Sequence, residues 1–415
     1  MKKVLSLFLC LSLLLSFIPL QSNTVHAQPD DFNTARYGDV IDIGTKLRNL
    51  QQNEDFIEEA REKIKKNSKE INFAEMEALV SQNNDSYFTY DGGTKYFLNR
   101  DLDFKTFTLR SEGKHVEIWV ANDLSYGHGE KPEDIVTQEQ VDKLANVFDE
   151  TIYPKDTDFF GTPNFHDGSN SPLPEMVGLP EGYYNSENGK IIMLVDNIID
   201  ESYNDPSYPF FVSGFYWGTL ESYIDRNIIT IDTNSMETRL EETYFRTVAH
   251  EFQHLIHDDN DPMEEAWINE GMSDFAEYLC FGTHPMGHVN FFLDNSENSL
   301  VDWDEHYNVE RGPENLADYG QAYLLQLYLK DHYGQGFIRA LAKDKDYGIE
   351  SVNKMLEGFN TGIDFEELFR RFTIAAAIDN EEPGDGVYNF DSIDLNVNFE
   401  QDIEYDKHGY SNLGF

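Results

Sequence analysis

Residues 245–257 read FRTVAHEFQHLIH, and this stretch decides how the rest of the chain is interpreted. Its apolar residues recur at helical spacing and predict a helix over residues 236–257. His250 and His254 are four residues apart, so both imidazoles lie on one helical face and can bind one cation. Glu251 is one step round the helix, within reach of a water molecule at that cation. The pattern predicts a metal centre; its alternative is two surface histidines on an ordinary helix.

A catalytic zinc ion needs a third protein ligand and one open position. Residues 269–274 read NEGMSD and begin within a second predicted helix, 264–281. If this helix packs beside the first, it aims Glu270 at the metal. Asp274 is one turn further along the same face, where it can accept the second N–H of a ligand histidine. A solvated acidic helix face is the alternative, and the joint presence of both motifs favours the metal site.

Three segments carry a family resemblance: HEFQHLI (250–256), WINEGMSDFAEYL (267–279) and DYGQAYLLQLYLKDHYG (318–334). They resemble the hyicolysin family of secreted neutral zinc metalloproteases and share the glutamate-zincin pattern of thermolysin-like enzymes. The resemblance implies a zincin-type catalytic domain and a precursor with a signal, a pro-segment and a mature enzyme. It implies the following roles: zinc ligands His250, His254 and Glu270, catalytic base Glu251, and Asp274 orienting a ligand histidine.

The N-terminus has the features of an export signal. Lys2 and Lys3 precede an apolar run over residues 4–20, and residues 25–27 (VHA) have the form of a cleavage site. We predict a signal peptide over residues 1–27, cleaved after Ala27; a membrane anchor is the alternative. Only Cys280 would remain after cleavage, so no intramolecular disulfide forms. The chain is therefore predicted to be a secreted, extracellular bacterial protein.

The charge is unevenly distributed. The whole chain has a formal net charge of −46, yet residues 28–100 hold 10 basic and 14 acidic residues. Residues 101–415 hold 19 basic and 63 acidic residues. We predict a helical pro-segment over 28–100, inhibitory or assisting folding and released near Arg100, and a catalytic domain over 101–415. A permanent N-terminal appendage is the alternative. Such acidity excludes nucleic acid as a partner; no membrane contact after signal removal and a monomer are expected.

The fold class follows from the order of the predicted elements. Apolar, β-branched runs at 114–121, 190–196 and 227–232 predict strands, with a helix over 137–151 between the first two. After residue 232 helical spacing dominates. Strands first and helices later predict an α+β fold with a strand-rich N-terminal half and a helical C-terminal half. The later predicted helices are 236–257, 264–281, 318–332, 336–343, 349–358 and 364–378.

The predicted reaction is hydrolysis of peptide bonds in proteins or peptides by an endopeptidase. Glu251 takes the proton of a zinc-bound water as it attacks the carbonyl, and a further donor stabilises the oxyanion. Tyr319 is the candidate donor, with His306 and Tyr323 behind it; a packing role is its alternative. His288, expected in a loop after Pro285, and His332 are not expected to be ligands.

Two other readings of the sequence remain open. One is an extracellular binding module stabilised by structural zinc, which the intact Glu251 and the apparent three-ligand set disfavour. The other is an aminopeptidase, although no GxMEN signature precedes the motif. The acidic loops 156–167 and 379–385 offer oxygen ligands for structural Ca²⁺; solvated acidic loops are the alternative there.

Overall fold

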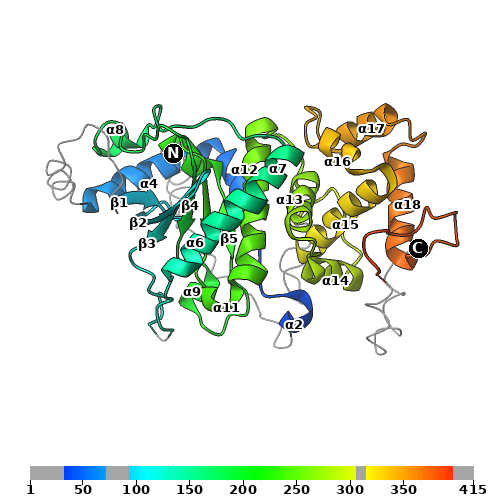
Figure 1. The fold of residues 1–415 in the computed structure, drawn as a ribbon, viewed down its shortest axis with the longest axis horizontal. Coiled ribbons are helices and arrows are strands. Elements are labelled where there is room, and N and C mark those ends of the chain that lie inside the picture. Colours follow the sequence, from blue (N-terminus) through cyan, green and yellow to red (C-terminus); the bar gives the residue numbers. More distant parts are fainter. Residues whose placement is uncertain (1–31, 72–92, 130, 305–314, 396–415) are drawn as a thin grey trace, which may run out of the picture.

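The computed structural model describes residues 32–71, 93–129, 131–304 and 315–395. The predicted signal peptide, its cleavage after Ala27, and His306 lie outside the described residues. The described chain is an α+β structure, which confirms the predicted fold class. One six-stranded sheet lies in the N-terminal half, and helices dominate toward the C-terminus (Figure 1).

The sheet has the strand order β1-β2-β3-β4-β6-β5. The neighbours β3, β4 and β6 run parallel, and every residue in these three strands is buried. Because strands buried on both faces appear as continuous apolar runs, these are the three strands that the sequence predicts. β1, β2 and β5 pair antiparallel with their neighbours. The strands are β1 (Thr94–Leu98), β2 (Phe104–Glu112), β3 (Val116–Ala121), β4 (Ile191–Val195), β5 (Gly214–Tyr216) and β6 (Ile228–Ile231).

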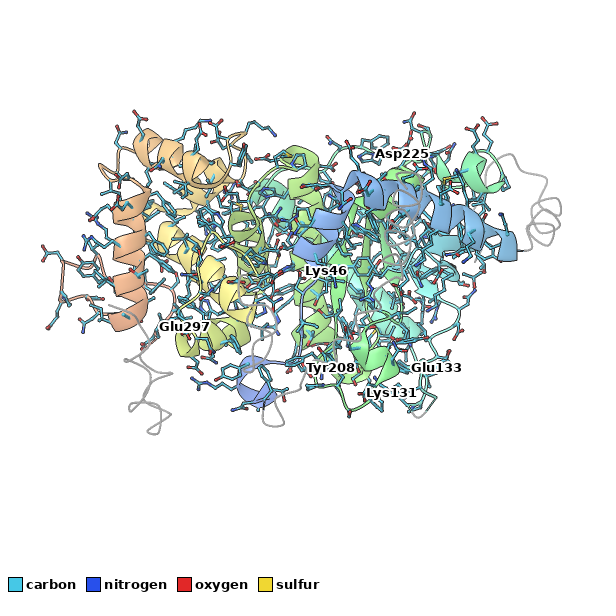
Figure 2. The ribbon with its side chains drawn as sticks, turned by 180° about the vertical axis from the view of Figure 1, so that it is seen from behind. Lys46, Lys131, Glu133, Tyr208, Asp225 and Glu297 are labelled. Carbon is cyan, nitrogen blue, oxygen red and sulfur yellow. The ribbon has the colours of Figure 1, made fainter. Side chains whose placement is uncertain are left out.

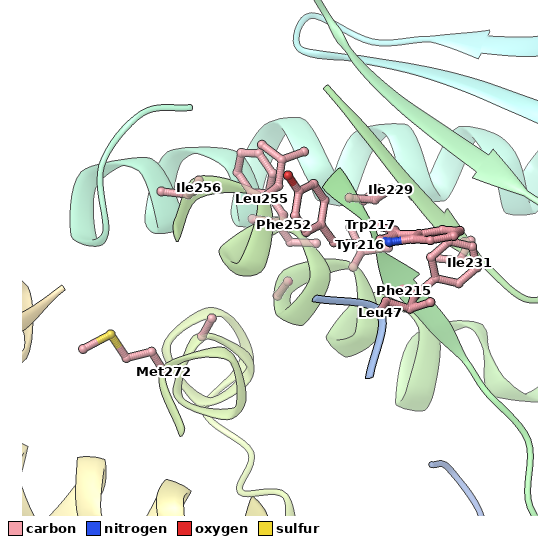
Figure 3. Packing of buried hydrophobic residues seen from close by; sticks show 14 of the residues in the cluster. Leu47, Phe215, Tyr216, Trp217, Ile229, Ile231, Phe252, Leu255, Ile256 and Met272 are labelled. Carbon is pink, nitrogen blue, oxygen red and sulfur yellow. The ribbon is translucent and has the colours of Figure 1, made fainter. Parts of the chain in front are cut away.

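The helix α12 (Phe245–Asn260) lies between the sheet and the C-terminal helices. In Figure 1 it stands near the centre, with the sheet on one side and α13 (Ala266–Phe281) and α15 (Asn315–Tyr333) on the other. Its apolar residues Phe252 and Leu255 are completely buried (Figure 3). The helix is therefore held on both sides, which fixes the direction of its polar side chains.

Close packing of α13 on α15 depends on a glycine next to a predicted ligand. A Cβ atom at Gly271 would lie 2.8 Å from the backbone oxygen of Ala322, closer than real Cβ contacts allow. Only glycine therefore permits the two helices to approach this closely. Because Gly271 follows Glu270 directly, the same contact sets the position of that carboxylate.

The remaining helices largely follow the sequence prediction. The helix predicted over 137–151 begins with a capping box, formed by Thr137 and Gln140 at the start of α6. A further helix, α14, was not predicted: His288 lies in it, so the expected loop after Pro285 is wrong. Other helices are α6 (Gln138–Val147), α7 (Tyr153–Phe159), α8 (Leu173–Val177), α9 (Glu201–Asn204), α10 (Gly218–Ile224), α11 (Met236–Arg239), α14 (Met286–Asp294), α16 (Gln335–Leu341), α17 (Gly348–Gly358) and α18 (Phe365–Ile378), with π-helical turns at Phe148–Ile152 and Leu240–Tyr244.

Residues 32–71, called the N-terminal segment below, are helical but have no core of their own. They form α2 (Thr34–Tyr37), α3 (Gly44–Gln51), α4 (Glu54–Asn67) and a short 3-10 turn. Leu47 of α3 is buried in the same apolar cluster as Phe215 and Trp217 (Figure 3). Figure 2 shows this segment crossing the back of the molecule, with Lys46 near the middle. The segment thus lies directly against the region that contains the predicted site.

Two further features bear on the predicted organisation. The predicted boundary at residue 100 falls between β1 and β2. Both strands belong to the sheet, in which β1 is an edge strand paired with β2. Cleavage after Arg100 would therefore remove a strand from the sheet. Among the helices of the described residues, none has the length and apolarity needed to cross a bilayer.

Candidate metal centre

The three predicted ligands come together at the contact between α12 and α13. The His254 Nε2 atom lies 3.0 Å from Glu270 Oε2, and His250 Nε2 lies 3.7 Å from the same oxygen. All three residues are buried, with Glu270 fully inaccessible. The helical spacing of the histidines and the close packing of α13 therefore produce the convergence that the sequence predicts.

This group of atoms fits a tetrahedral metal ion. His250 Nε2, His254 Nε2 and Glu270 Oε2 are all buried and have no hydrogen-bond partner in the described chain. Ligand atoms about 2.0–2.1 Å from a tetrahedral zinc ion would be about 3.3 Å apart, between the two distances above. Two imidazoles and one carboxylate are also a donor set that zinc accepts. The three residues form a group that could hold a metal ion.

The other nitrogen of each imidazole is held by neighbours on α13. His254 Nδ1 lies 2.6 Å from Asn269 Oδ1 and 3.0 Å from the Ser273 hydroxyl oxygen. An acceptor at Nδ1 fixes the tautomer in which Nε2 has a free lone pair. Sequence reasoning did not assign these roles to Asn269 and Ser273, although both lie in the NEGMSD stretch. Their spacing of four residues puts them on one helical face and was the available signal.

The Nδ1 atom of His250 faces two carboxylates. This atom lies 3.3 Å from Asp274 Oδ1 and 3.3 Å from Glu277 Oε1. The structure therefore places Asp274 beside His250, one of the predicted ligands. The second oxygen of Asp274 is bonded to His288 Nδ1 at 2.7 Å. His288 thus contributes through Asp274 and not as a member of the ligand group.

The pKa values of Glu270 and His250 reflect two opposing effects: burial, and the proximity of groups of opposite charge. Burial raises the pKa of Glu270, but the charge of His254, the close approach of both imidazoles and the charge of Arg48 bring it well below its usual range. Burial lowers the pKa of His250, yet the nearby carboxylates of Asp274, Glu270 and Glu277 raise it well above normal. Glu270 is therefore ionised, as a metal-binding carboxylate must be.

Glu251 lies beside this group with its carboxylate held in one position. Its Oε2 atom accepts a hydrogen bond of 2.7 Å from the backbone N–H of Tyr216 in β5. Burial, together with the neighbouring charge of Asp42, raises the pKa of Glu251 well above its usual range. The side chain is thus next to the ligand group. No side chain or backbone group of the described residues is seen to form a hydrogen bond with its other oxygen, Oε1.

Tyr319 is close to the ligand group, but its hydroxyl is hydrogen-bonded to Asp42. The ring centres of Tyr319 and His250 are 6.3 Å apart. Its hydroxyl donates a hydrogen bond of 2.7 Å to Asp42 Oδ1. Tyr323 does not stand behind it as a second donor, because its hydroxyl is bonded to His284 instead. His332 Nε2 lies 3.1 Å from the backbone oxygen of Asn389 and is outside the ligand group, as expected.

The N-terminal segment supplies contacts that sequence reasoning missed. Asp42 Oδ2 lies 3.8 Å from His250 Nε2, and the Thr45 hydroxyl and Arg48 guanidinium donate to Glu270 Oε1 at 2.7 and 2.9 Å. A small cavity remains beside α3, lined by Gly44, Arg48, Gln51, Tyr216, His254 and Asp258. No spacing rule links the residues of the N-terminal segment to the HExxH motif, His250 to His254, in α12. Only the fold could therefore reveal these contacts.

In the predicted calcium loops, Asp156, Asp167 and Asp379 have other partners. Asp156 is buried in α7 against the thiol of Cys280, and Asp167 accepts from the backbone of Ser169. The two oxygens of Asp379 accept from the backbone of Phe390 and Leu395. Among the described residues, no group of three or more metal-ligand side chains contains any of these aspartates.

Comparison with known proteins does not identify the chain: no family model and no curated protein matches it. The function has to be inferred from the geometry of the site.

Proposed function

We propose that this chain is the precursor of a secreted zinc-dependent endopeptidase. The observation that supports this most is the convergence of His250, His254 and Glu270 on one buried point, with Glu251 beside them. The ligand group leaves room for one further partner, which is typical of catalytic zinc. The export signal predicted from residues 1–27 and the acidity of residues 101–415 suit an extracellular enzyme.

The roles of the residues follow from their contacts. When bound, zinc polarises a peptide carbonyl and makes water a better nucleophile. Glu251 accepts the proton of the attacking water and passes it to the leaving amine, while the N–H of Tyr216 holds its carboxylate. Asn269 and Ser273 orient His254, and Asp274 orients His250. Proteins and peptides are the proposed substrates.

We further propose that the N-terminal segment keeps the precursor inactive. Asp42 lies over the ligand group, while Thr45 and Arg48 bind Glu270 directly. The carboxylate of Asp42 accepts from Tyr319, which is the contact expected of an oxyanion in the active enzyme. The segment thus occupies the space that a substrate needs. Its release must leave β1 in place, so we propose cleavage before Thr94 in preference to Arg100.

The position of Asp42 near His250 also supports the alternative of an extracellular binding module with structural zinc. If the N-terminal segment stays in place, Asp42 would complete a closed, four-ligand site of structural type. The two proposals differ in whether the segment leaves and whether peptide bonds are then cut. N-terminal sequencing of the exported protein separates them, because a start at Gln28 after prolonged secretion supports a permanent segment.

Hydrolysis of casein by the secreted, processed protein tests the proposed function. We expect activity that 1,10-phenanthroline abolishes and added Zn²⁺ restores. A peptide with an acetylated N-terminus should also be cut internally, which an aminopeptidase cannot do. Absence of hydrolysis in the processed protein, combined with chelator-sensitive thermal stability, would favour the binding module.

A further inference from the structure

A second group of ligand side chains lies near the C-terminal end of α12, away from the first. It contains His166 of the loop after α7, Glu221 of α10 and Asp259 of α12. His166 Nε2 lies 3.5 Å from Glu221 Oε1 and 3.6 Å from Asp259 Oδ1. These separations are close to the roughly 3.3 Å expected between two ligands of one tetrahedral ion. Three elements distant in sequence thus aim one nitrogen and two oxygens at a common point.

The imidazole of His166 is oriented as metal-binding histidines are. Its Nδ1 atom lies 3.0 Å from Asp225 Oδ1, so Nδ1–H donates to the carboxylate and the lone pair of Nε2 faces the other two residues. Asp225 is itself fixed, because its Oδ2 atom accepts 2.8 Å from the backbone N–H of Asn170. Asp225 therefore has the position of the outer carboxylate in a carboxylate–histidine–metal arrangement. Figure 2 shows Asp225 well apart from Lys46.

Glu221 is the part of this group that the protein alone does not satisfy. The residue is only 7% exposed, and its Oε2 atom is buried without a hydrogen-bond partner. Leaving a buried carboxylate oxygen unpaired is costly, so such a group takes up a proton or binds a cation or water. Within the group, only the imidazole of His166 can compensate the negative charge of the carboxylates.

Among residues 32–71, 93–129, 131–304 and 315–395, no basic side chain neutralises the three carboxylates. Within the described part of the chain, no Lys or Arg forms an ion pair with Glu221, Asp225 or Asp259. The adjacent Arg226 is turned away, because its guanidinium binds Glu117 at 3.2 Å. The remaining sources of positive charge are a proton and a cation from solution. The His166 side chain is 27% exposed, which gives such a cation a way in.

The donor atoms select the kind of cation. Ca²⁺ and Mg²⁺ prefer sites made of oxygen alone, whereas an imidazole nitrogen with carboxylates suits zinc and related transition-metal ions. We propose that His166, Glu221 and Asp259 bind a second divalent transition-metal ion, zinc in the first instance, which ties the loop of residues 164–170 and α10 to α12. This site is independent of the proposed protease activity, since none of its ligands belongs to the first group.

The site would support the wall beside the first group. α10 follows β5 after one residue, and β5 supplies the Tyr216 N–H that holds Glu251. Asp259 also accepts from the backbone N–H of Asn164 at 2.7 Å, so the loop already contacts α12 at this point. An ion here would join these three elements by bonds stronger than single hydrogen bonds. Its role is structural, because no substrate-facing group such as Glu251 accompanies it.

The proposal is tested by measuring the zinc content of the full chain. All variants carry Glu251→Gln, which prevents self-processing. After dialysis against a low zinc concentration, we expect two zinc ions per chain by elemental analysis. His166→Gln and Glu221→Gln should each lose the ion of the second group and retain one zinc ion. His254→Gln should lose the ion of the first group and also retain one. The exposed Glu187→Gln is the matched control and should retain two. Circular dichroism verifies that each variant is folded.

A second measurement guards against variants that simply fold poorly. Asp225→Asn should keep two zinc ions at saturation but bind one of them about 10–100-fold more weakly. Glu221→Gln should raise the thermal midpoint of the metal-free protein and lower that of the zinc-loaded protein, relative to the parent. If Glu221→Gln instead destabilises the metal-free protein, the group is a histidine ion pair and the proposal is overturned.

The outcomes for the two sites can be told apart. Retention of two zinc ions by His166→Gln, or Ca²⁺ binding there in preference to Zn²⁺, overturns the second site alone. One zinc ion that is lost in His166→Gln and kept in His254→Gln would uphold the second site and contradict the proposed function.

Discussion

Two of the ligand groups that α12 helps to form, the first around His250 and the second around His166, differ in what surrounds them. His250, His254 and Glu270 are almost wholly buried beneath the N-terminal segment, whose Arg48 neutralises Glu270. His166 of the second group is partly exposed, and no basic residue of the described chain pairs with its carboxylates. The first group is compensated by the N-terminal segment, which we propose is removed. The second would be compensated by the cation that we propose binds there.

This difference indicates two separate uses of similar donors. A group covered by a removable segment can become accessible and change its partners, which a catalytic site requires. A group that lacks any internal compensation is most stable when it stays filled, which suits a structural site. The following predictions are designed to contradict or sharpen this contrast.

The largest expected effect is on catalysis by the first group. Glu251→Gln should reduce casein hydrolysis by the processed protein by about 10²- to 10⁴-fold, because the amide cannot accept a proton. Zinc content should not change, since Glu251 is not in the ligand group. Glu242→Gln, an exposed position just before α12, is the control and should remain fully active. Full proteolysis by Glu251→Gln would refute the assigned mechanism.

The covering segment provides the next largest effect. Asp42→Asn in the uncleaved chain should increase residual proteolysis by about tenfold or more, because one charge-assisted contact contributes about 1.5–3 kcal/mol. The measurement is the initial rate on a fluorogenic peptide, with uncleaved chain verified by gel. Glu59→Gln, exposed on α4, should have no effect. An unchanged rate for Asp42→Asn would argue against Asp42 as the blocking group.

A packing change should separate the two groups from each other. Gly271→Val should lower the free energy of unfolding by about 2–3 kcal/mol, because its side chain meets the backbone of α15. It should displace Glu270 and weaken zinc binding at the first group while the second retains its ion. Urea unfolding and zinc counting measure both effects. Gly336→Ala, where a Cβ atom has space, should be neutral or slightly stabilising.

The smallest expected effect concerns a third buried group, His257, Asp261 and Glu264. Here Glu264 Oε1 accepts from the backbone N–H groups of Gly348 and Glu265, so this carboxylate has protein partners. Burial nevertheless raises the pKa of Glu264 to about 7. A raised folded-state pKa means that Glu264 contributes stability below about pH 4.5, which is lost as the pH rises through 7.

Replacement by glutamine should remove this pH dependence. The free energy of unfolding of the parent should fall by about 1–2 kcal/mol from pH 4.5 to 7 relative to Glu264→Gln. Denaturant titrations at several pH values measure the difference. A parallel pH dependence for both proteins would show that Glu264 is not the responsible group. Glu265→Gln is not a suitable control because its side chain binds Trp267; the exposed Glu350→Gln is preferable.

Much of the first group could be predicted from sequence, because its determinants are local. The four-residue spacing of His250 and His254 fixes them on one face of any helix that forms there. The second motif places Glu270, Ser273 and Asp274 along one side of α13 in the same way. The three parallel strands were equally recognisable, since complete burial makes them continuous apolar runs.

The missed elements lack such local signals. β1 and β2 are half-buried strands at one side of the sheet, and β5 has only three residues, so none is a long apolar run. α14 was obscured by Pro285, although a proline directly before a helix is well tolerated. In each case the packing partner, and not the segment itself, determines the conformation.

The sequence by itself thus determined the α+β class, the HExxH helix and the ligands that periodicity puts on one face. Only the tertiary structure decided that Asp42 and Arg48 cover the first group and that His166, Glu221 and Asp259 form a second. The physical reason is the range of the interactions. Helical periodicity acts over a few residues, whereas a contact between distant elements depends on how the whole chain packs.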